Sequence, residues 1–456
     1  PCGSTQRDGT ILQKMRTYET VIMQLTGIGL LILVKFSCVT ASIDKQFSDT
    51  IKGNNFAVNL PLFNAVFTSS GNLQGITSIF KQKHRSALSK QFTSGNTEPL
   101  LRLFPEYATS PFHMSTEQSS DEKSEYKVIF TSDTHSITWR FNENSHVFYI
   151  ETNSSALSDT LFISGTNTST IETKQKYSSV VIDNHNFKHI KESYPVDASN
   201  NMRYWVGKRD RFWTFLVRPG VRILNINSED NNILIYTSDS LTDDTLSFTI
   251  YAGPITMKNL NEAGKECTYL LYPLWFWMRW LSIGLLYLFD SILFITGNSV
   301  ISIVLLSICV KIIILPLYSI AVRWQNEVNR QKSILEPRLL EINKRYKGEE
   351  RTKMTLAVHR ELGISPLYAL KSLLSAAIQI PIFFAAYHVL SEHIALSGIS
   401  FLWISDLAFP DRLIRLPFSV PILGSYLNIF PFVMTSVSLI SSLVHIDKSL
   451  SDQLHK

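Results

Sequence analysis

Apolar residues gather near the amino terminus of this chain and again from residue 269 onward, and between these parts they alternate with polar residues. A helix needs about 20 apolar residues to cross the hydrocarbon core of a bilayer. Four runs reach or approach that length: Val21–Ile43, Ser299–Val322, Leu367–Leu390 and Phe418–Val444. The pattern therefore predicts an integral membrane protein whose membrane part is α-helical.

The first apolar run has the features of a targeting segment. Lys14 and Arg16 precede it, and the small-residue sequence Val39-Thr40-Ala41 near its end resembles a cleavage site. Residues 1–44 are therefore either an uncleaved signal anchor or a signal peptide that is removed. In both cases the segment that follows is carried across the membrane.

The alternating stretch predicts a soluble β domain at residues 45–265. Period-two alternation is typical of strands with one buried face, and clusters of Asn, Asp, Ser and Gly separate the bursts as turns do. The clearest strands are predicted at Tyr126–Phe130, Ser136–Phe141, His146–Ile150, Phe212–Val217, Ile233–Tyr236 and Leu246–Tyr251. The predicted fold class is a polytopic α-helical membrane protein with an amino-terminal β-sandwich domain.

Positive charge sets the expected orientation, because short cytoplasmic loops are enriched in Lys and Arg. Residues 323–363 hold ten basic residues, whereas the loop 391–417 holds Arg412 and Arg415 against three acidic residues. The first region is therefore expected in the cytoplasm and the second outside.

The basic region has the composition and periodicity of a helical hairpin. We expect arms at about Trp324–Lys347 and Glu350–Leu362, with breaks at Gly348 and Gly363 and a kink at Pro337. Its charges form either a solvated face or a docking surface for a ribosome, a nascent chain or lipid headgroups. The candidate docking residues are Arg330, Lys332, Arg338, Lys344, Arg345 and Lys347.

A fifth apolar stretch, Tyr269–Ile295, mixes aromatic residues with Arg279 and Asp290. This mixture is typical of a helix that lies in the membrane interface. If the stretch crossed the membrane, the basic amino terminus and the basic hairpin would face opposite sides. We therefore predict an interfacial amphipathic helix at 266–298 and a membrane core at 299–456.

Lys311 interrupts the second apolar run near its middle. It lies about twelve residues, or roughly 18 Å, from either end, and an ionised lysine at that depth costs about 2.5–3.5 kcal/mol. The third and fourth runs contain no Asp or Glu that could pair with it. A water-filled cavity open to one side would accommodate the charge, and Ser307, one turn earlier, extends the same polar face. Pro316 is expected to disturb the helix beyond it.

Composition limits the remaining chemistry. The chain has 456 residues, a net charge of +5 and four scattered cysteines, Cys2, Cys38, Cys267 and Cys309. It has no CxxC pair, no Cys/His spacing suited to zinc, no phosphate-binding loop and no HExxH sequence. We therefore expect no catalytic residues, no metal or other cofactor and no direct nucleic-acid binding, so the chain is not expected to be an enzyme.

Several short segments occur in the order known from one family. They are Tyr251-Ala252-Gly253-Pro254, Val310-Lys311 with Leu315-Pro316-Leu317, Leu335-Glu336-Pro337, Ser365-Pro366-Leu367, Ile378–Phe383 and Phe401–Ile404. Together they resemble the YidC-type membrane protein insertases, in the Gram-negative form with a large periplasmic domain. The resemblance implies a multi-pass protein of the bacterial inner membrane with its β-sandwich in the periplasm.

The resemblance also implies a mechanism. The family has a positively charged hydrophilic groove in the inner leaflet, and Lys311 stands where an arginine normally does. Ser307, Gln379, Ile380 and Phe383 complete the expected groove. The implied function is an insertase and chaperone that assists insertion, folding and assembly of membrane proteins. Its implied partners are nascent membrane proteins and membrane lipids, with the Sec translocon and the ribosome as further candidates.

Two departures from the family pattern keep other functions open. The family has five core membrane helices, and this chain supplies about three, which indicates a carboxyl-terminally truncated sequence or a reduced form. Lysine in place of the arginine keeps the charge but loses the bidentate fork. The alternatives are an envelope protein whose β domain binds a partner, and a small transporter in which Lys311 is an anion site.

Overall fold

The computed structural model describes residues 56–454, with gaps at 69–70, 82–86, 94–98, 104–112, 119–124, 133–135, 154–159, 165–177, 184–186, 197–203, 230–231, 238–244, 272–275, 369 and 421–423. The predicted targeting segment, residues 1–44, lies outside the described residues. Of these described residues, 288–381 form one compact unit, and 56–287 with 382–454 form a second.

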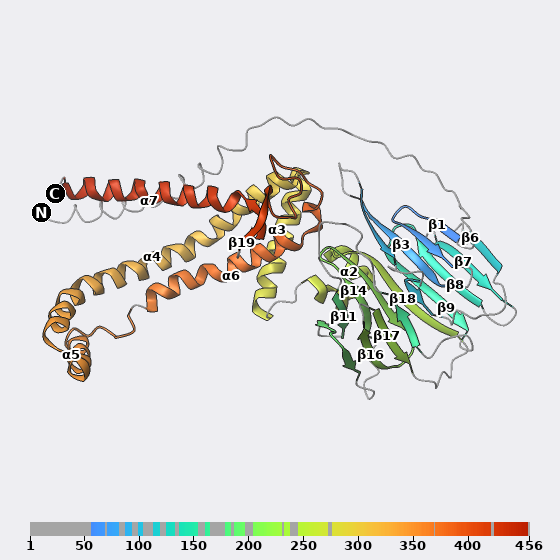
Figure 1. Cartoon of the computed structure of the whole chain (residues 1–456), viewed down its shortest axis with the longest axis horizontal. Coiled ribbons are helices and arrows are strands. Elements are labelled where there is room, and N and C mark those ends of the chain that lie inside the picture. Colours follow the sequence, from blue (N-terminus) through green and yellow to red (C-terminus); the bar gives the residue numbers. More distant parts are fainter. Residues whose placement is uncertain are drawn as a thin grey trace, which may run out of the picture. The chain divides into compact units, whose positions relative to one another are not determined.

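The first sheet of the β domain has nine antiparallel strands (Figure 1). They are β1 (Phe56–Asn59), β2 (Phe63–Phe67), β3 (Leu73–Phe80), β4 (Leu88–Thr93), β5 (Leu101–Arg102), β10 (Thr160–Ile163), β13 (Ser193–Pro195), β16 (Ile223–Glu229) and β17 (Asn232–Thr237). The spatial order is β1-β2-β3-β5-β10-β17-β16-β13, and β4 pairs with β3.

The second sheet also has nine antiparallel strands. They are β6 (His113–Gln118), β7 (Glu125–Thr131), β8 (Ser136–Asn142), β9 (Val147–Asn153), β11 (Ser178–Ile182), β12 (Phe187–His189), β14 (Trp205–Arg209), β15 (Trp213–Pro219) and β18 (Thr245–Pro254). Their order is β12-β11-β14-β15-β18-β9-β8-β7-β6. All six strands that the alternation predicted are present.

One hydrophobic core joins the two sheets. In β8, Ile137, Trp139 and Phe141 are buried and alternate with half-buried polar residues, as the period-two pattern predicts. The Trp139 ring lies 4.9 Å from that of Phe67 on the other sheet, centroid to centroid, and its Nε1 donates to the Gly71 carbonyl. The predicted β-sandwich is therefore confirmed as an architecture.

Two short helices and one long helix follow the sandwich. They are α2 (Met257–Ala263), the 3-10 helix η2 (Lys265–Leu271) and α3 (Phe276–Thr296). Within the predicted interfacial segment, 266–298, the described residues form η2 and α3. Over Met278–Thr296, α3 is also long and apolar enough to span a membrane, so its interfacial position stays a prediction.

The second apolar run and the first hairpin arm form a single helix, α4 (Ser299–Arg345), of 47 residues. The sequence predicted that Pro316 would disturb the helix beyond it, whereas the helix is continuous from Ser299 to Arg345. The helix continues through Pro316 and Pro337, because a proline removes one backbone hydrogen bond while the turns on either side keep theirs. Helix α5 (Gly348–Glu361) forms the second arm.

The last part of the chain contains α6 (Leu370–Glu392), η3 (Ile394–Leu396), the hairpin strands β19 (Arg412–Val420) and β20 (Gly424–Asn428), and α7 (Phe430–Leu454). The fourth predicted apolar helix is present as α7, but its predicted start at Phe418 is wrong, since that residue lies in β19. Pro417 and Pro421 disfavour a helix there, which hydropathy alone does not register. The Asp411 carboxylate accepts hydrogen bonds from Ile429 N and Phe430 N and caps the start of α7.

Candidate functional site

Lys311 lies in the apolar half of α4. Asn298 caps this helix by accepting from Val300 N and Ile301 N, so Lys311 is about 18 Å along the helix axis from its start. The lysine is half-buried, while the adjacent Ile312 and Ile313 are exposed. Among the described residues, Lys311 has no ion pair within 4.0 Å. A carboxylate partner is therefore absent from the described part of the chain.

Ser307 lies one turn before Lys311 and is exposed. Its hydroxyl donates to the Ile303 carbonyl at 2.9 Å, which leaves the oxygen lone pairs available as acceptors. Residues four apart lie on one helix face, so Ser307 and Lys311 form the short polar stripe that the sequence predicted.

The other predicted groove residues lie on α6. Gln379, Ile380 and Phe383 are all exposed, Ile380 by 52% and Phe383 by 65%. Gln379 and Phe383 are four residues apart and share a face. No hydrogen bond of the described residues joins Gln379 to Lys311 or Ser307, so the groove itself stays a prediction.

The basic hairpin consists of the end of α4 and α5, as predicted. Val328, Leu335 and Ile342 are buried on α4 at intervals of seven residues, which places them on one face. On α5, His359 is buried and its Nδ1 lies 3.0 Å from the Ile364 carbonyl oxygen. The buried apolar residues thus lie on one face of α4.

All six candidate docking residues of the hairpin are exposed: Arg330, Lys332, Arg338, Lys344, Arg345 and Lys347. Arg338 pairs with Glu361 across the two arms at 3.2 Å, and Arg345 pairs with Glu341 along α4 at 2.9 Å. These pairs are solvated, so they leave the basic surface accessible.

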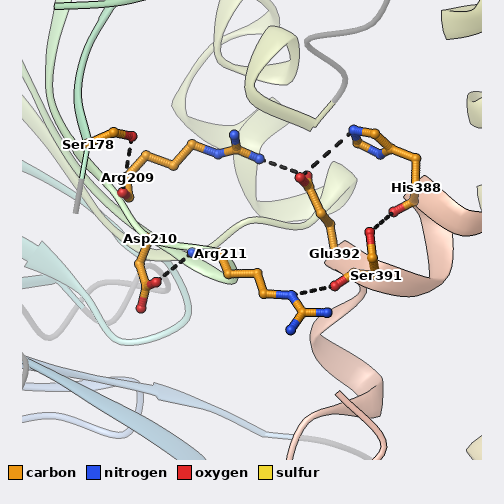
Figure 2. Close-up of polar contacts among 7 residues, drawn as sticks. All are labelled: Ser178, Arg209, Asp210, Arg211, His388, Ser391 and Glu392. Carbon is orange, nitrogen blue, oxygen red and sulfur yellow. Dashed lines mark hydrogen bonds and ion pairs between the residues drawn. The ribbon is translucent and has the colours of Figure 1, made fainter. Parts of the chain in front are cut away.

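Two arginines of the sandwich contact the carboxyl-terminal end of α6 (Figure 2). Arg209 Nη2 lies 2.7 Å from Glu392 Oε2. Arg211 Nε donates to the Ser391 carbonyl at 2.6 Å, and its Nη1 donates to the Ala408 carbonyl. Burial lowers the pKa of Arg211, and nearby carboxylates, Glu392 foremost, oppose that shift. This contact was not predicted from the sequence.

Two hydrogen bonds and an ion pair of Asp210 hold the turn that carries Arg211 in place. Asp210 N donates to the Trp213 carbonyl at 2.8 Å, and Asp210 Oδ1 accepts from Arg211 N. Lys90 of β4 pairs with Asp210 Oδ2 at 3.0 Å. The only signal in the sequence was an Arg-Asp-Arg triplet directly before the predicted strand Phe212–Val217.

A second polar contact ties the sandwich to η2. Glu266 Oε1 accepts from Trp205 Nε1 and pairs with Arg218 Nη1, both at 3.1 Å. The Arg218 guanidinium also lies over the Trp205 ring, 4.8 Å from its centroid. Because Trp205 and Arg218 lie on β14 and β15, the same strand pair provides both contacts.

The segment Tyr251-Ala252-Gly253-Pro254 lies at the end of β18 and is buried. Tyr251 donates to the Pro254 carbonyl, and His146 packs against Gly253 with Nδ1 3.3 Å from Ser78 Oγ. Burial lowers the pKa of His146 to about 4. A side chain at Gly253 would lie 2.8 Å from the His146 ring, so only glycine fits there. The segment is structural. No group of three His, Cys, Asp or Glu side chains suited to a metal occurs in the part of the chain that the structure describes.

An apolar helix with an internal lysine, a basic helical hairpin and a separate β-sandwich are together typical of a helical membrane protein with a large domain outside the bilayer. Residues 292–454 match the model of the family described as 60Kd inner membrane protein. This stretch of the chain is therefore similar to the YidC family, and the resemblance seen in the short motifs is confirmed.

Curated relatives agree with this assignment. "Membrane protein insertase YidC" of Amoebophilus asiaticus is 26% identical over 56% of this chain and 45% of the relative. That of Chloroherpeton thalassium is 25% identical over 65% and 56%, and that of Bacteroides fragilis is 30% identical over 42% and 32%. The chain thus spans about half the length, or less, of these relatives.

Two solved structures show a weaker likeness. A crystal structure of an active YidC insertase with its first transmembrane domain resolved is 15% identical, with a TM-score of 0.28 over 79% of this chain and 77% of that chain. YidC from Thermotoga maritima is 12% identical, with a TM-score of 0.34 over 76% and 98%. TM-scores this low carry no argument about the site.

Proposed function

We propose that this protein assists the insertion of membrane proteins into the bacterial inner membrane through a groove that contains Lys311. The observation that carries the proposal is a half-buried lysine, without a carboxylate partner among the described residues, in the apolar half of α4. The surrounding stretch is similar to the 60Kd inner membrane protein family, and curated relatives of the chain are named membrane protein insertase. A lysine with only a structural role in the membrane would need a carboxylate partner, whereas a lysine in a substrate groove would bind a polar or acidic segment of the substrate.

In the proposed reaction, Lys311 attracts a short acidic or polar segment of an incoming chain. The apolar part of that chain then moves into lipid past Ile380 and Phe383. Transfer of each Leu, Ile, Phe or Val into the bilayer centre contributes roughly 0.3–0.6 kcal/mol, so the step needs no nucleotide. The Ser307 hydroxyl oxygen can accept a hydrogen bond from water, which keeps water near the charge of Lys311.

The proposed topology places the basic hairpin in the cytoplasm and the sandwich in the periplasm. The exposed basic residues of the hairpin support this orientation, and they suit a ribosome or a nascent chain as partner. The contact between the sandwich and the end of α6 also supports it, because both are expected on the side opposite the hairpin. Cooperation with a Sec translocon is part of the proposal.

The test replaces Lys311 by Ala and by Arg and measures insertion of a small single-span substrate with an acidic tail into proteoliposomes. Lys311→Ala is expected to lower insertion at least tenfold, and Lys311→Arg to retain most of it, because the charge is kept. Lys353→Ala, which removes an exposed lysine of α5, is the matched control. Insertion by Lys311→Ala at the level of the control would overturn the proposal.

A further inference from the structure

Arg211 completes the carboxyl-terminal end of α6. The last carbonyls of any helix lack intrahelical partners and carry the negative end of the helix dipole. The Arg211 guanidinium donates to one of them, Ser391 O, at 2.6 Å (Figure 2). It also donates to Ala408 O in the following loop. One side chain of the sandwich therefore joins the helix end to its own loop.

Arg209 adds a side-chain contact to the same helix end. Its side chain is only 9% exposed, and it pairs with Glu392, which is 26% exposed. The other carboxylate oxygen, Oε1, lies 3.8 Å from His388 Nε2 one turn earlier. Removal of Glu392 would leave a nearly buried guanidinium without this counter-charge, so the pair favours the docked arrangement strongly.

Apolar contacts close the same junction. Ile394 and Ala408 of the loop after α6 belong to the hydrophobic core of the sandwich, and Phe409 packs against that core. The Arg211 guanidinium lies over the Phe409 ring, 5.8 Å from its centroid. The loop is thus part of the sandwich core, and the arginines lie at its edge.

We propose that Arg209 and Arg211 are positioning residues that anchor the carboxyl-terminal end of α6 to the sandwich, so that the β domain fixes this helix end and the loop after it. The sandwich is then a structural support for that helix end rather than an independent module. The consequence for insertion rests on the proposed function, whereas the anchoring itself does not.

The anchoring is tested by hydrogen exchange on the full chain in lipid nanodiscs. Arg211→Ala is expected to speed amide exchange at least tenfold across residues 388–411 and to leave β7 and β8 unchanged. Arg211→Lys is expected to resemble Arg211→Ala, because an ammonium cannot reproduce the two-carbonyl fork. The matched control is Arg140→Ala, which removes an arginine paired with Glu151 on the exposed side of the sandwich.

If Arg211→Ala unfolds the sandwich, the anchoring is tested instead by swapping the charges of Arg209 and Glu392. Arg209→Glu and Glu392→Arg alone are each expected to speed exchange across residues 388–411, and the double variant to restore protection. Exchange within twofold of wild type in all these variants would overturn the anchoring.

Insertion is measured on the same proteins, with Lys311→Ala beside them. Arg211→Ala is expected to lower insertion at least fivefold while β7 and β8 stay protected. Unchanged insertion by Arg211→Ala, in an assay where Lys311→Ala fails, would overturn the positioning role. If Lys311→Ala inserts as well as wild type, the groove proposal fails, and hydrogen exchange alone decides the anchoring.

Discussion

The β-sandwich and the basic helical hairpin place their polar groups in opposite surroundings. In the sandwich, Trp139 and Trp205 are completely buried and His146 is 3% exposed. In the hairpin, the paired side chains of Arg338 and Glu361 are 53% and 61% exposed. Stability of the sandwich therefore depends on packing and desolvation, whereas the hairpin keeps its charges in water, where they contribute little to folding and remain accessible to a partner.

The largest loss of folding stability is expected from Trp139→Ala in the core of the sandwich. Truncation removes the ring that stacks on Phe141 and contacts Phe67, and leaves a cavity, at a cost of about 3–5 kcal/mol in the free energy of unfolding. Denaturant unfolding followed by intrinsic fluorescence measures it. Tyr149→Ala, on an adjacent strand and 49% exposed, is the control and should cost less than about 1 kcal/mol. Equal losses would contradict the comparison.

The second-largest expected effect is a pH dependence of sandwich stability that comes from His146. Burial lowers the pKa of His146 to about 4, against about 6.5 in an unfolded chain. Between these values the unfolded state binds more protons, so stability is complete above pH 6.5 and falls as the pH drops towards 4, by roughly 3 kcal/mol. Urea unfolding at several pH values measures this loss.

His146→Gln should flatten the pH profile in that window, because glutamine does not titrate. His113→Gln, in an exposed position of β6, should leave the wild-type profile unchanged. A profile of wild-type steepness in His146→Gln would assign the pH dependence to another group.

The sandwich and the hairpin also differ in how far the sequence reveals them. Strands such as β8 were predictable, because alternate residues enter one core and the pattern is local. The start of the fourth apolar helix was mispredicted as Phe418, because a hydropathy pattern does not register the effect of proline on the backbone. Phe418 lies in the strand β19, and the helix begins at Phe430. The Arg209–Glu392 pair was not predictable, since its members are 183 residues apart and neither has a local signature. Lys311 was recognisable because a charge inside an apolar run is itself unusual.

A smaller effect is expected at the end of the hairpin, where Gly363 has a φ of +62°. No atom lies within 4 Å of the position that a β-carbon would take at this residue, so Gly363→Ala costs only the backbone strain, about 1 kcal/mol. Gly363→Asn should cost less, because asparagine tolerates this conformation. Amide exchange in α5 measures both, and an equal loss in the two variants would exclude backbone strain as the cause.

The smallest effect on folding is expected from Arg338→Ala. Its pair with Glu361 is solvated, so its loss should change hairpin stability by less than about 1 kcal/mol, and by less still at about 1 M salt, where charges are screened beyond about 3 Å. Exchange rates in α4 and α5 measure this effect, and ribosome binding by the same variant measures docking. Weaker binding with unchanged exchange would show that the exposed charge serves a partner rather than the fold. A destabilisation as large as that of Trp139→Ala would show instead that the hairpin, like the sandwich, depends on each of its polar groups for stability.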